Sequence, residues 1–131
     1  MSIRGGFRHV YLISEDPKAT ADWYVKALGA EIADSEERRG TWNVTMRLGE
    51  ADLRVRKTRE TDDIGASNEG RSLGIHHFAL TVDDIEGVIR RVEDAGRKLA
   101  EPVFTSVSGN LIGYVLAPDD VLVELIQPSD A

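Results

Sequence analysis

The sequence contains no cysteine. None of its 131 residues is Cys, and only 6% are aromatic. A chain without Cys cannot form a disulfide framework, a Cys-type zinc finger, an iron–sulfur cluster or a thiol nucleophile. These four kinds of site are therefore excluded.

The sequence also lacks an excess of positive charge and any long apolar run. It has 16 Lys and Arg against 23 Asp and Glu, a net charge of −7. Proteins that track nucleic-acid phosphates normally carry the opposite sign. No apolar stretch approaches the roughly 20 residues that cross a bilayer, and residues 1–8 are not followed by the apolar block of a signal peptide. We expect a cytoplasmic protein that binds neither nucleic acid nor membranes.

An internal repeat organises the chain. His9–Ile13 and His77–Val82 are alternating runs rich in β-branched residues, and each is followed by a pattern typical of an amphipathic helix. An Asp can cap each helix at its start, and Gly29 and Gly96 mark the two ends. The two halves therefore begin with the same strand–helix unit.

Three strand-like segments follow each helix. They are 30–33, 42–48 and 52–57 in the first half, and 98–103, 110–116 and 121–127 in the second. We predict an α+β fold with one domain over residues 1–131: a βαβββ module at about 7–57, a polar linker at 58–74 and a second module at about 75–128. The two mixed sheets should pair into an open, curved barrel with the helices outside and a concave side free for a ligand.

Strand alternation assigns candidate residues to that concave side. Successive side chains of a strand point to opposite faces, so the apolar set of each strand packs under a helix and the remainder points inward. The inward set includes the polar residues His9, Tyr11, Arg54, Arg56, His77 and Glu124. Glu124 lies between inward apolar neighbours, where a charge needs a partner.

Two imidazoles and one carboxylate suit a divalent transition metal. His9, His77 and Glu124 could hold Fe, Mn, Ni, Co or Zn and leave coordination positions open for substrate. Two alternatives stay open on alternation alone: the histidines could be hydrogen-bonded core residues, and Glu124 could form an ion pair with Arg54.

Two further segments receive structural interpretations. His76 should face away from His77 and serve a structural role, because neighbours in a regular strand point in opposite directions. The charged run 36–39 (EERR) should be a solvated turn.

Several motifs resemble one known family. They are HVYL at 9–12, Asp16, WY at 23–24, LG at 28–29, GIHHFALTVDDI at 74–85 and the closing segment 114–127. Together they are similar to the vicinal oxygen chelate superfamily, which includes glyoxalase I, bleomycin-resistance and fosfomycin-resistance proteins and extradiol dioxygenases. The second module start resembles the methylmalonyl-CoA epimerase branch most, and the resemblance covers nearly the whole chain.

The resemblance implies a metal in the cavity, held by the first and last strands of each module. The matching positions are His9, Arg54, His77 and Glu124. Glyoxalases and epimerases of the family have Glu or Gln where this chain has Arg54, and a charged Arg cannot ligate a metal. The remaining His, His, Glu set is similar to the Fe(II) ligands of extradiol dioxygenases.

Two hypotheses for function follow. The first is a metal-dependent lyase, isomerase, epimerase or dioxygenase whose small anionic substrate chelates the ion through two neighbouring oxygens. Glu124 would be its catalytic acid or base, and Arg54, Tyr11 and Tyr114 would bind substrate. The second is a metal-free protein that sequesters a small molecule. The resemblance and the exposed sheet edges also imply a homodimer.

Overall fold

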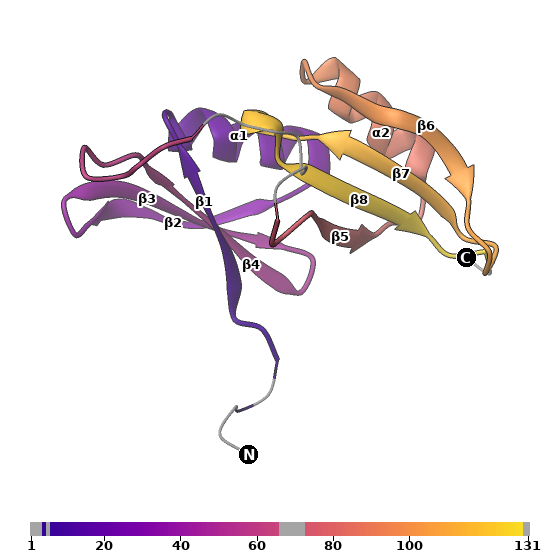
Figure 1. Cartoon of the computed structure of the whole chain (residues 1–131), viewed down its shortest axis with the longest axis horizontal. Coiled ribbons are helices and arrows are strands. Elements are labelled where there is room, and N and C mark those ends of the chain that lie inside the picture. The colour runs from indigo at the N-terminus through magenta and orange to yellow at the C-terminus, as the bar shows by residue number, and fades with distance from the viewer. Residues whose placement is uncertain (1–3, 5, 66–72, 130–131) are drawn as a thin grey trace. The chain divides into compact units, whose positions relative to one another are not determined.

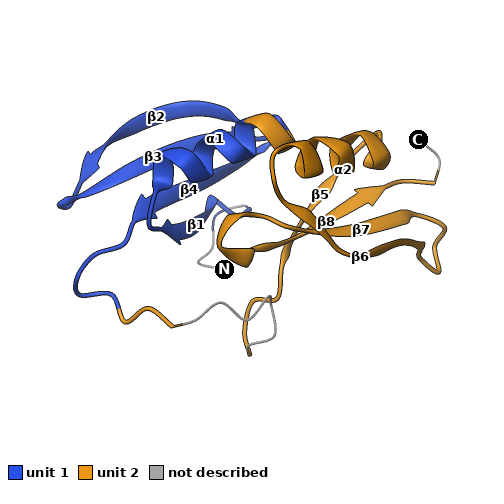
Figure 2. Ribbon diagram, turned by 90° about the horizontal axis from the view of Figure 1, so that it is seen from above, with its two compact units in different colours: residues 1–25, 29–62 blue, residues 26–28, 63–131 orange. Residues whose placement is uncertain are grey.

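The chain forms two compact units. The structure, a computed structural model, describes residues 4, 6–65 and 73–129. Unit 1 comprises residues 1–25 and 29–62, and unit 2 comprises residues 26–28 and 63–131 (Figure 2). Residues 66–72 of the expected linker 58–74 lie outside the described residues. The organisation as a single domain stays a prediction.

Unit 1 is a strand, a helix and three further strands (Figure 1). Its elements are β1 (His9–Ser14), α1 (Pro17–Leu28), β2 (Glu31–Arg38), β3 (Thr41–Leu48) and β4 (Ala51–Lys57). The sheet order is β1-β4-β3-β2, with β1 and β4 parallel and the other neighbours antiparallel. The Asp16 carboxylate accepts from the Ala19 backbone N–H at 3.1 Å, and Gly29 adopts φ 75°, so α1 begins and ends where the sequence predicts.

Unit 2 repeats this order. Its elements are β5 (Phe78–Thr81), α2 (Ile85–Asp94), β6 (Lys98–Thr105), β7 (Leu111–Leu116), a 3₁₀ turn (Pro118–Asp120) and β8 (Leu122–Gln127). The sheet order is β5-β8-β7-β6, again with one parallel pair, β5 and β8. The predicted α+β fold of two βαβββ modules is therefore confirmed. Within the described segments, no helix has the length and apolarity needed to span a membrane.

Strand alternation gives each sheet one buried apolar face and one polar face. In β4, Leu53 and Val55 are almost fully buried, whereas Arg54 between them is half-buried on the opposite face. In β8, Val123 and Leu125 are fully buried, and Glu124 lies on the opposite face. We call the faces that carry Arg54 and Glu124 the polar face of unit 1 and of unit 2.

Helix α2 covers the apolar face of unit 2. A Cβ atom built on Gly113 of β7 would lie 3.2 Å from Cδ1 of Ile85 and 3.7 Å from Cδ1 of Ile89. The missing side chain at Gly113 therefore lets α2 approach the sheet closely. The polar face of unit 2 is left on the other side.

The expectation of a solvated turn at 36–39 is wrong for most of that run. Residues 36–38 continue β2, and only Arg39 and Gly40 form the turn, with φ 50° and 79°. Arg38 donates to Asp34 at 2.5 Å and to Glu36 at 2.7 Å. These residues recur at every second position, so their side chains share one strand face and neutralise each other there.

Candidate functional site

Two of the predicted metal ligands meet on the polar face of unit 2. His77 Nε2 lies 3.0 Å from Glu124 Oε1, and the two side chains are 26% and 16% exposed. Glu124 sits in the middle of β8, paired with Ala79 of β5 on one side and Tyr114 of β7 on the other. His77 immediately precedes β5, so the parallel β5–β8 pair brings together residues 47 positions apart.

His76 joins this pair, contrary to the expectation that it faces away. Its Nδ1 lies 2.8 Å from Nδ1 of His77, and the two rings meet edge to face. Alternation fails here because β5 begins only at Phe78, after a turn in which Gly74 has φ 105°. Outside a regular strand, neighbouring side chains can share a face.

The contacts define how the two histidines share hydrogens. A carboxylate only accepts, so His77 donates from Nε2 to Glu124. In neutral His77 the other nitrogen, Nδ1, then accepts, so His76 donates from its own Nδ1. His76 therefore orients the ring of His77. If donor and acceptor exchanged between the two Nδ1 atoms, His77 would carry its hydrogen on Nδ1 and its Nε2 would be free to bind a metal.

Tyr114 joins His76, His77 and Glu124 in a polar cluster on the polar face of unit 2. Its ring lies 5.2 Å from the ring of His77 in an edge-to-face arrangement. Burial raises the pKa of the Tyr114 phenol, and the carboxylate of Glu124 raises it further. Tyr114 therefore keeps its proton near neutral pH and can act as a hydrogen-bond donor.

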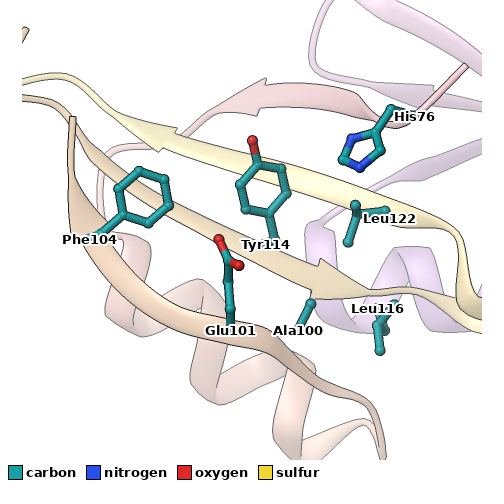
Figure 3. A pocket seen from close by; sticks show the side chains of 7 residues that line it. All are labelled: His76, Ala100, Glu101, Phe104, Tyr114, Leu116 and Leu122. Atoms are coloured by element: carbon teal, nitrogen blue, oxygen red, sulfur yellow. The ribbon is translucent and has the colours of Figure 1, made fainter. Parts of the chain in front are cut away.

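A cavity of about 380 Å³ opens beside this cluster on the polar face of unit 2 (Figure 3). Most of its wall is apolar or aromatic. The lining residues are His76, Ala100, Glu101, Phe104, Tyr114, Leu116 and Leu122. Its size and composition are typical of a small-molecule binding site. In such sites most of the wall is apolar, and a few polar groups orient the ligand.

Unit 1 carries His9 and Arg54 on its polar face. Nδ1 of His9 and Nε of Arg54 are both buried, and neither has a hydrogen-bond partner within the described residues. Buried polar atoms are normally satisfied, so each is a candidate to contact a ligand. Tyr11, two residues after His9 in β1 and paired with Arg54 of β4, donates its hydroxyl hydrogen to Oδ1 of Asn43.

A neighbouring acid does not neutralise Arg54. The carboxylate of Asp52 instead pairs with Arg47 at 2.7 Å. That hydrogen bond lowers the pKa of Asp52 most, and the positive charge of Arg54 lowers it further. Arg54 forms no ion pair in the described part of unit 1, and it retains capacity for an anion.

His9 and Arg54 occupy the places in unit 1 that His77 and Glu124 occupy in unit 2. Each histidine stands at or just before the first strand, and each charged residue lies at the same step of the last strand. Within the described residues, no group of three His, Asp or Glu side chains is arranged to hold a metal. In unit 2 two of the predicted ligands, His77 and Glu124, contact each other.

Sequence reasoning missed Asn43, Asp62 and the pocket residues Glu101 and Phe104. Asp62 accepts two hydrogen bonds of 2.9 Å from Arg56. It falls in the expected linker, whose composition carries no sign of a partner. Of this ion pair the sequence indicated only Arg56, because strand alternation places it on the polar face.

Comparison with known proteins identifies relatives over nearly the whole chain. A model of the Glyoxalase/Bleomycin resistance protein/Dioxygenase superfamily matches residues 6–125. Lactoylglutathione lyase from Pseudomonas aeruginosa is 26% identical over 147 aligned positions, covering 94% of this chain and 82% of that protein.

Solved structures share the fold. A glyoxalase family protein from Enterococcus faecalis matches with a TM-score of 0.75 and 26% identity, covering 92% of this chain and 96% of that one. The fosfomycin resistance protein FosX from Listeria monocytogenes, crystallised with Mn(II) and 1S,2S-dihydroxypropylphosphonic acid, matches with a TM-score of 0.71 and 16% identity. That match covers 95% of this chain and 93% of FosX.

Proposed function

Because this chain belongs to the Glyoxalase/Bleomycin resistance protein/Dioxygenase superfamily, the vicinal oxygen chelate group, we propose that it is a divalent-metal-dependent enzyme. Its substrate would be a small anion that offers two neighbouring oxygens. His77, Glu124 and His9 would hold the ion. The observation that carries this proposal is the contact between His77 and Glu124 in unit 2.

The distance between these two side chains fits a shared metal ion. Ligands of such an ion lie about 2.0–2.2 Å from it, so the two side chains that would hold it must lie close to each other. His77 Nε2 and Glu124 Oε1 are separated by 3.0 Å. An imidazole nitrogen and a carboxylate oxygen also form a donor pair that Fe, Mn, Ni, Co and Zn accept.

His9 is proposed as the third ligand and Arg54 as the group that binds the substrate anion. His9 is the module 1 equivalent of His77, and its ring has a buried nitrogen without a partner. Arg54 takes the place of the fourth ligand, where it adds positive charge beside a cation. An anionic substrate relieves that repulsion and gains a charge-assisted hydrogen bond.

The remaining polar residues would position substrate and move a proton. When bound, the metal supplies Lewis-acid stabilisation of an oxyanion. Glu124 is the matched carboxylate that could take a proton from a substrate carbon, as a lyase or isomerase requires. Tyr114 keeps its proton and can donate to a substrate oxygen. Tyr11 is held in place through its hydroxyl by Asn43.

Two relatives support a small, oxygen-rich substrate. The Pseudomonas aeruginosa protein is a lactoylglutathione lyase, and FosX was crystallised with Mn(II) and a dihydroxy phosphonic acid. For this chain the choice between lyase or isomerase chemistry and extradiol-type oxygenation rests on Arg54. A lyase of this family uses a carboxylate or amide there, whereas an extradiol-type site needs only the two histidines and Glu124.

Metal analysis tests the proposal. Untagged protein should carry about one ion per chain, and added Fe(II), Mn(II), Ni(II) or Zn(II) should raise the melting temperature because binding stabilises the folded state. Protein that carries no metal, and that none of these ions stabilises, would overturn the enzyme hypothesis.

The second candidate function is metal-free binding of a small molecule. The cavity of unit 2 favours it, because neither His77 nor Glu124 lines that cavity. Stabilisation by organic ligands without any by metals would support this alternative.

We also propose a homodimer in the cytoplasm, with the two modules acting as one domain. Sedimentation velocity at micromolar concentration tests the assembly. A species near 14.4 kDa, the mass of one chain, would reject the dimer.

A further inference from the structure

Strand β6 is irregular at the pocket of unit 2. Its register with β7 shifts between Leu99 and Glu101 and again between Glu101 and Phe104. Ala100 and Glu101 are adjacent in the chain, yet both line the pocket, whereas a regular strand would point them to opposite faces. Bulges often re-aim a side chain beside a functional site. The two register shifts therefore direct Glu101 toward the cavity.

The carboxylate of Glu101 has no counter-ion. It forms no ion pair or hydrogen bond in the parts of the chain that the structure describes, and no Lys or Arg is among the pocket residues. Its side chain extends from β6 toward the ring of Tyr114, its cross-strand partner in β7 (Figure 3). Glu124, the cross-strand neighbour of Tyr114, adds a second negative charge nearby.

Aromatic rings stand beside this carboxylate. Phe104, which lines the pocket, is 43% exposed, and Tyr114 lies in the middle of the pocket floor in Figure 3. The face of an aromatic ring attracts cations through its quadrupole. Leu116 and Leu122 supply apolar surface for the hydrocarbon part of a ligand.

We propose that the pocket of unit 2 binds small organic cations, with Glu101 as the counter-ion and the rings of Phe104 and Tyr114 as its aromatic walls. An alkyl- or aryl-ammonium group matches all three features of this 380 Å³ cavity. An anion placed beside Glu101 would be repelled by its carboxylate, whereas a cation would be attracted. All lining residues of this site belong to unit 2, and the site requires no metal.

A titration of the full-length protein with benzyltrimethylammonium tests this site. The probe carries a fixed positive charge next to an aromatic ring, and benzyl alcohol and benzoate are its neutral and anionic controls. NMR chemical shifts should move at residues 76, 101, 104 and 114 with the cation and not with benzoate. Added salt should weaken the binding of the cation, because the charges are solvent-accessible.

Two variants and one control separate the contributions. Glu101→Gln keeps the shape of the side chain and should weaken binding of the cation about threefold or more, with no change for benzyl alcohol. Phe104→Leu should weaken it about two- to fivefold through loss of the ring face. Glu93→Gln, on the exposed side of α2, should change nothing.

Several results would overturn the proposal. They are a lack of detectable cation binding, equal binding of benzoate, shifts confined to other residues, or an unchanged affinity in Glu101→Gln. The metal content of each sample is measured in parallel. Failure of the cation site is therefore distinguishable from failure of the proposed metal-dependent activity.

Discussion

The two units share a topology but differ in the chemistry of their polar faces. In unit 2 the paired positions hold His77 and Glu124, which contact each other. In unit 1 the same positions hold His9 and Arg54, and both have buried nitrogens without partners. Unit 2 presents an imidazole–carboxylate pair, and unit 1 presents an imidazole and a guanidinium.

The two units differ on their polar faces and agree on their buried faces. The buried faces keep the same alternation of apolar residues, because the core of each module depends on it. The polar faces are free to diverge, since a substitution there costs little packing. We propose that Arg54, at a position where glyoxalases of the family have Glu or Gln, contacts an anion instead of a metal.

The largest effect should come from removing the pair in unit 2. His77→Ala and Glu124→Ala each delete a proposed ligand, and metal affinity should fall by more than the roughly 10–100-fold that loss of an outer hydrogen-bond partner costs. Metal titration of the apo-protein measures this. Glu86→Gln on the exposed surface of α2 is the matched carboxylate control.

His76→Ala distinguishes the two histidines. It removes the Nδ1 contact that orients His77, so metal affinity should fall by up to about tenfold, less than in His77→Ala. A complete loss in His76→Ala with binding retained in His77→Ala would exchange their roles.

The next effect should come from making unit 1 resemble the glyoxalase pattern. Arg54→Gln restores a potential ligand and removes a positive charge. Metal should bind more tightly, and oxalate, a chelating anion, should bind more weakly by about 1.5–3 kcal/mol, the scale of a charged hydrogen bond. Calorimetry on the metal-loaded protein measures both affinities.

Arg47→Gln is the control for that exchange. Arg47 is a more exposed arginine on the same face of unit 1, and it is already paired with Asp52. Its loss should leave oxalate affinity unchanged. If Arg54→Gln also left oxalate affinity unchanged, Arg54 would not bind the substrate anion.

The apolar faces provide a comparison of packing. Gly113 of β7 corresponds in register to Val44 of β3, because each pairs with the residue after the charged position of the last strand. Gly113→Val would drive a side chain into Ile85 and Ile89 of α2, so the free energy of unfolding should fall by about 1–3 kcal/mol. Urea denaturation measures this loss.

Val44→Ala is the reciprocal change. It would leave a cavity in unit 1, where Val44 is 1% exposed, and should cost about 2 kcal/mol. Equal stability of Gly113→Val and the wild type would mean that α2 does not approach the sheet closely at Gly113.

Much of this fold could be predicted from the sequence, because its signals are local. Asp16 and Asp84 cap the two helices as expected. Alternation also sets the buried faces of β4 and β8, whereas Val10 of β1, expected to pack under a helix, is 40% exposed. These features depend on neighbours within a few residues, which a sequence shows directly.

The errors arose where the backbone departs from regular geometry. His76 was assigned by alternation, yet β5 begins only at Phe78. The pocket was missed because Glu101 enters it through two shifts in register between β6 and β7. Such shifts depend on pairing between distant segments, which local patterns do not encode. The metal ligands His9, His77 and Glu124 stay a prediction.

A smaller effect concerns the ion pair between Arg56 and Asp62 in unit 1. The hydrogen bond from Arg56 lowers the pKa of Asp62 most, and the Arg59 backbone N–H lowers it further, from 3.8 to about 2. The folded state therefore favours the charged form, so this stabilisation is present above pH 3.8 and is lost as the pH falls toward about 2. Asp62→Asn should be less stable than the wild type near neutral pH.

The stability difference between these two proteins should shrink on acidification. Urea denaturation at a series of pH values measures it. A difference that stayed constant down to pH 2 would show that Asp62 is not preferentially charged in the folded state.

The smallest effect concerns the turn between β2 and β3, which is tighter than the β6–β7 connection. Arg39 and Gly40 form it, and both have positive φ, 50° and 79°, as a type I′ turn requires. A non-glycine side chain is strained there, and Asn tolerates that conformation better than Arg. Arg39→Asn should therefore raise the free energy of unfolding by about 0.5 kcal/mol, a gain within the range of compatible turn substitutions. Arg39→Ala removes the same charge but keeps the strain, so it should give no gain in a urea titration run in parallel. Equal stabilisation by Asn and Ala would mean that charge at residue 39, and not backbone strain, sets the stability of this turn.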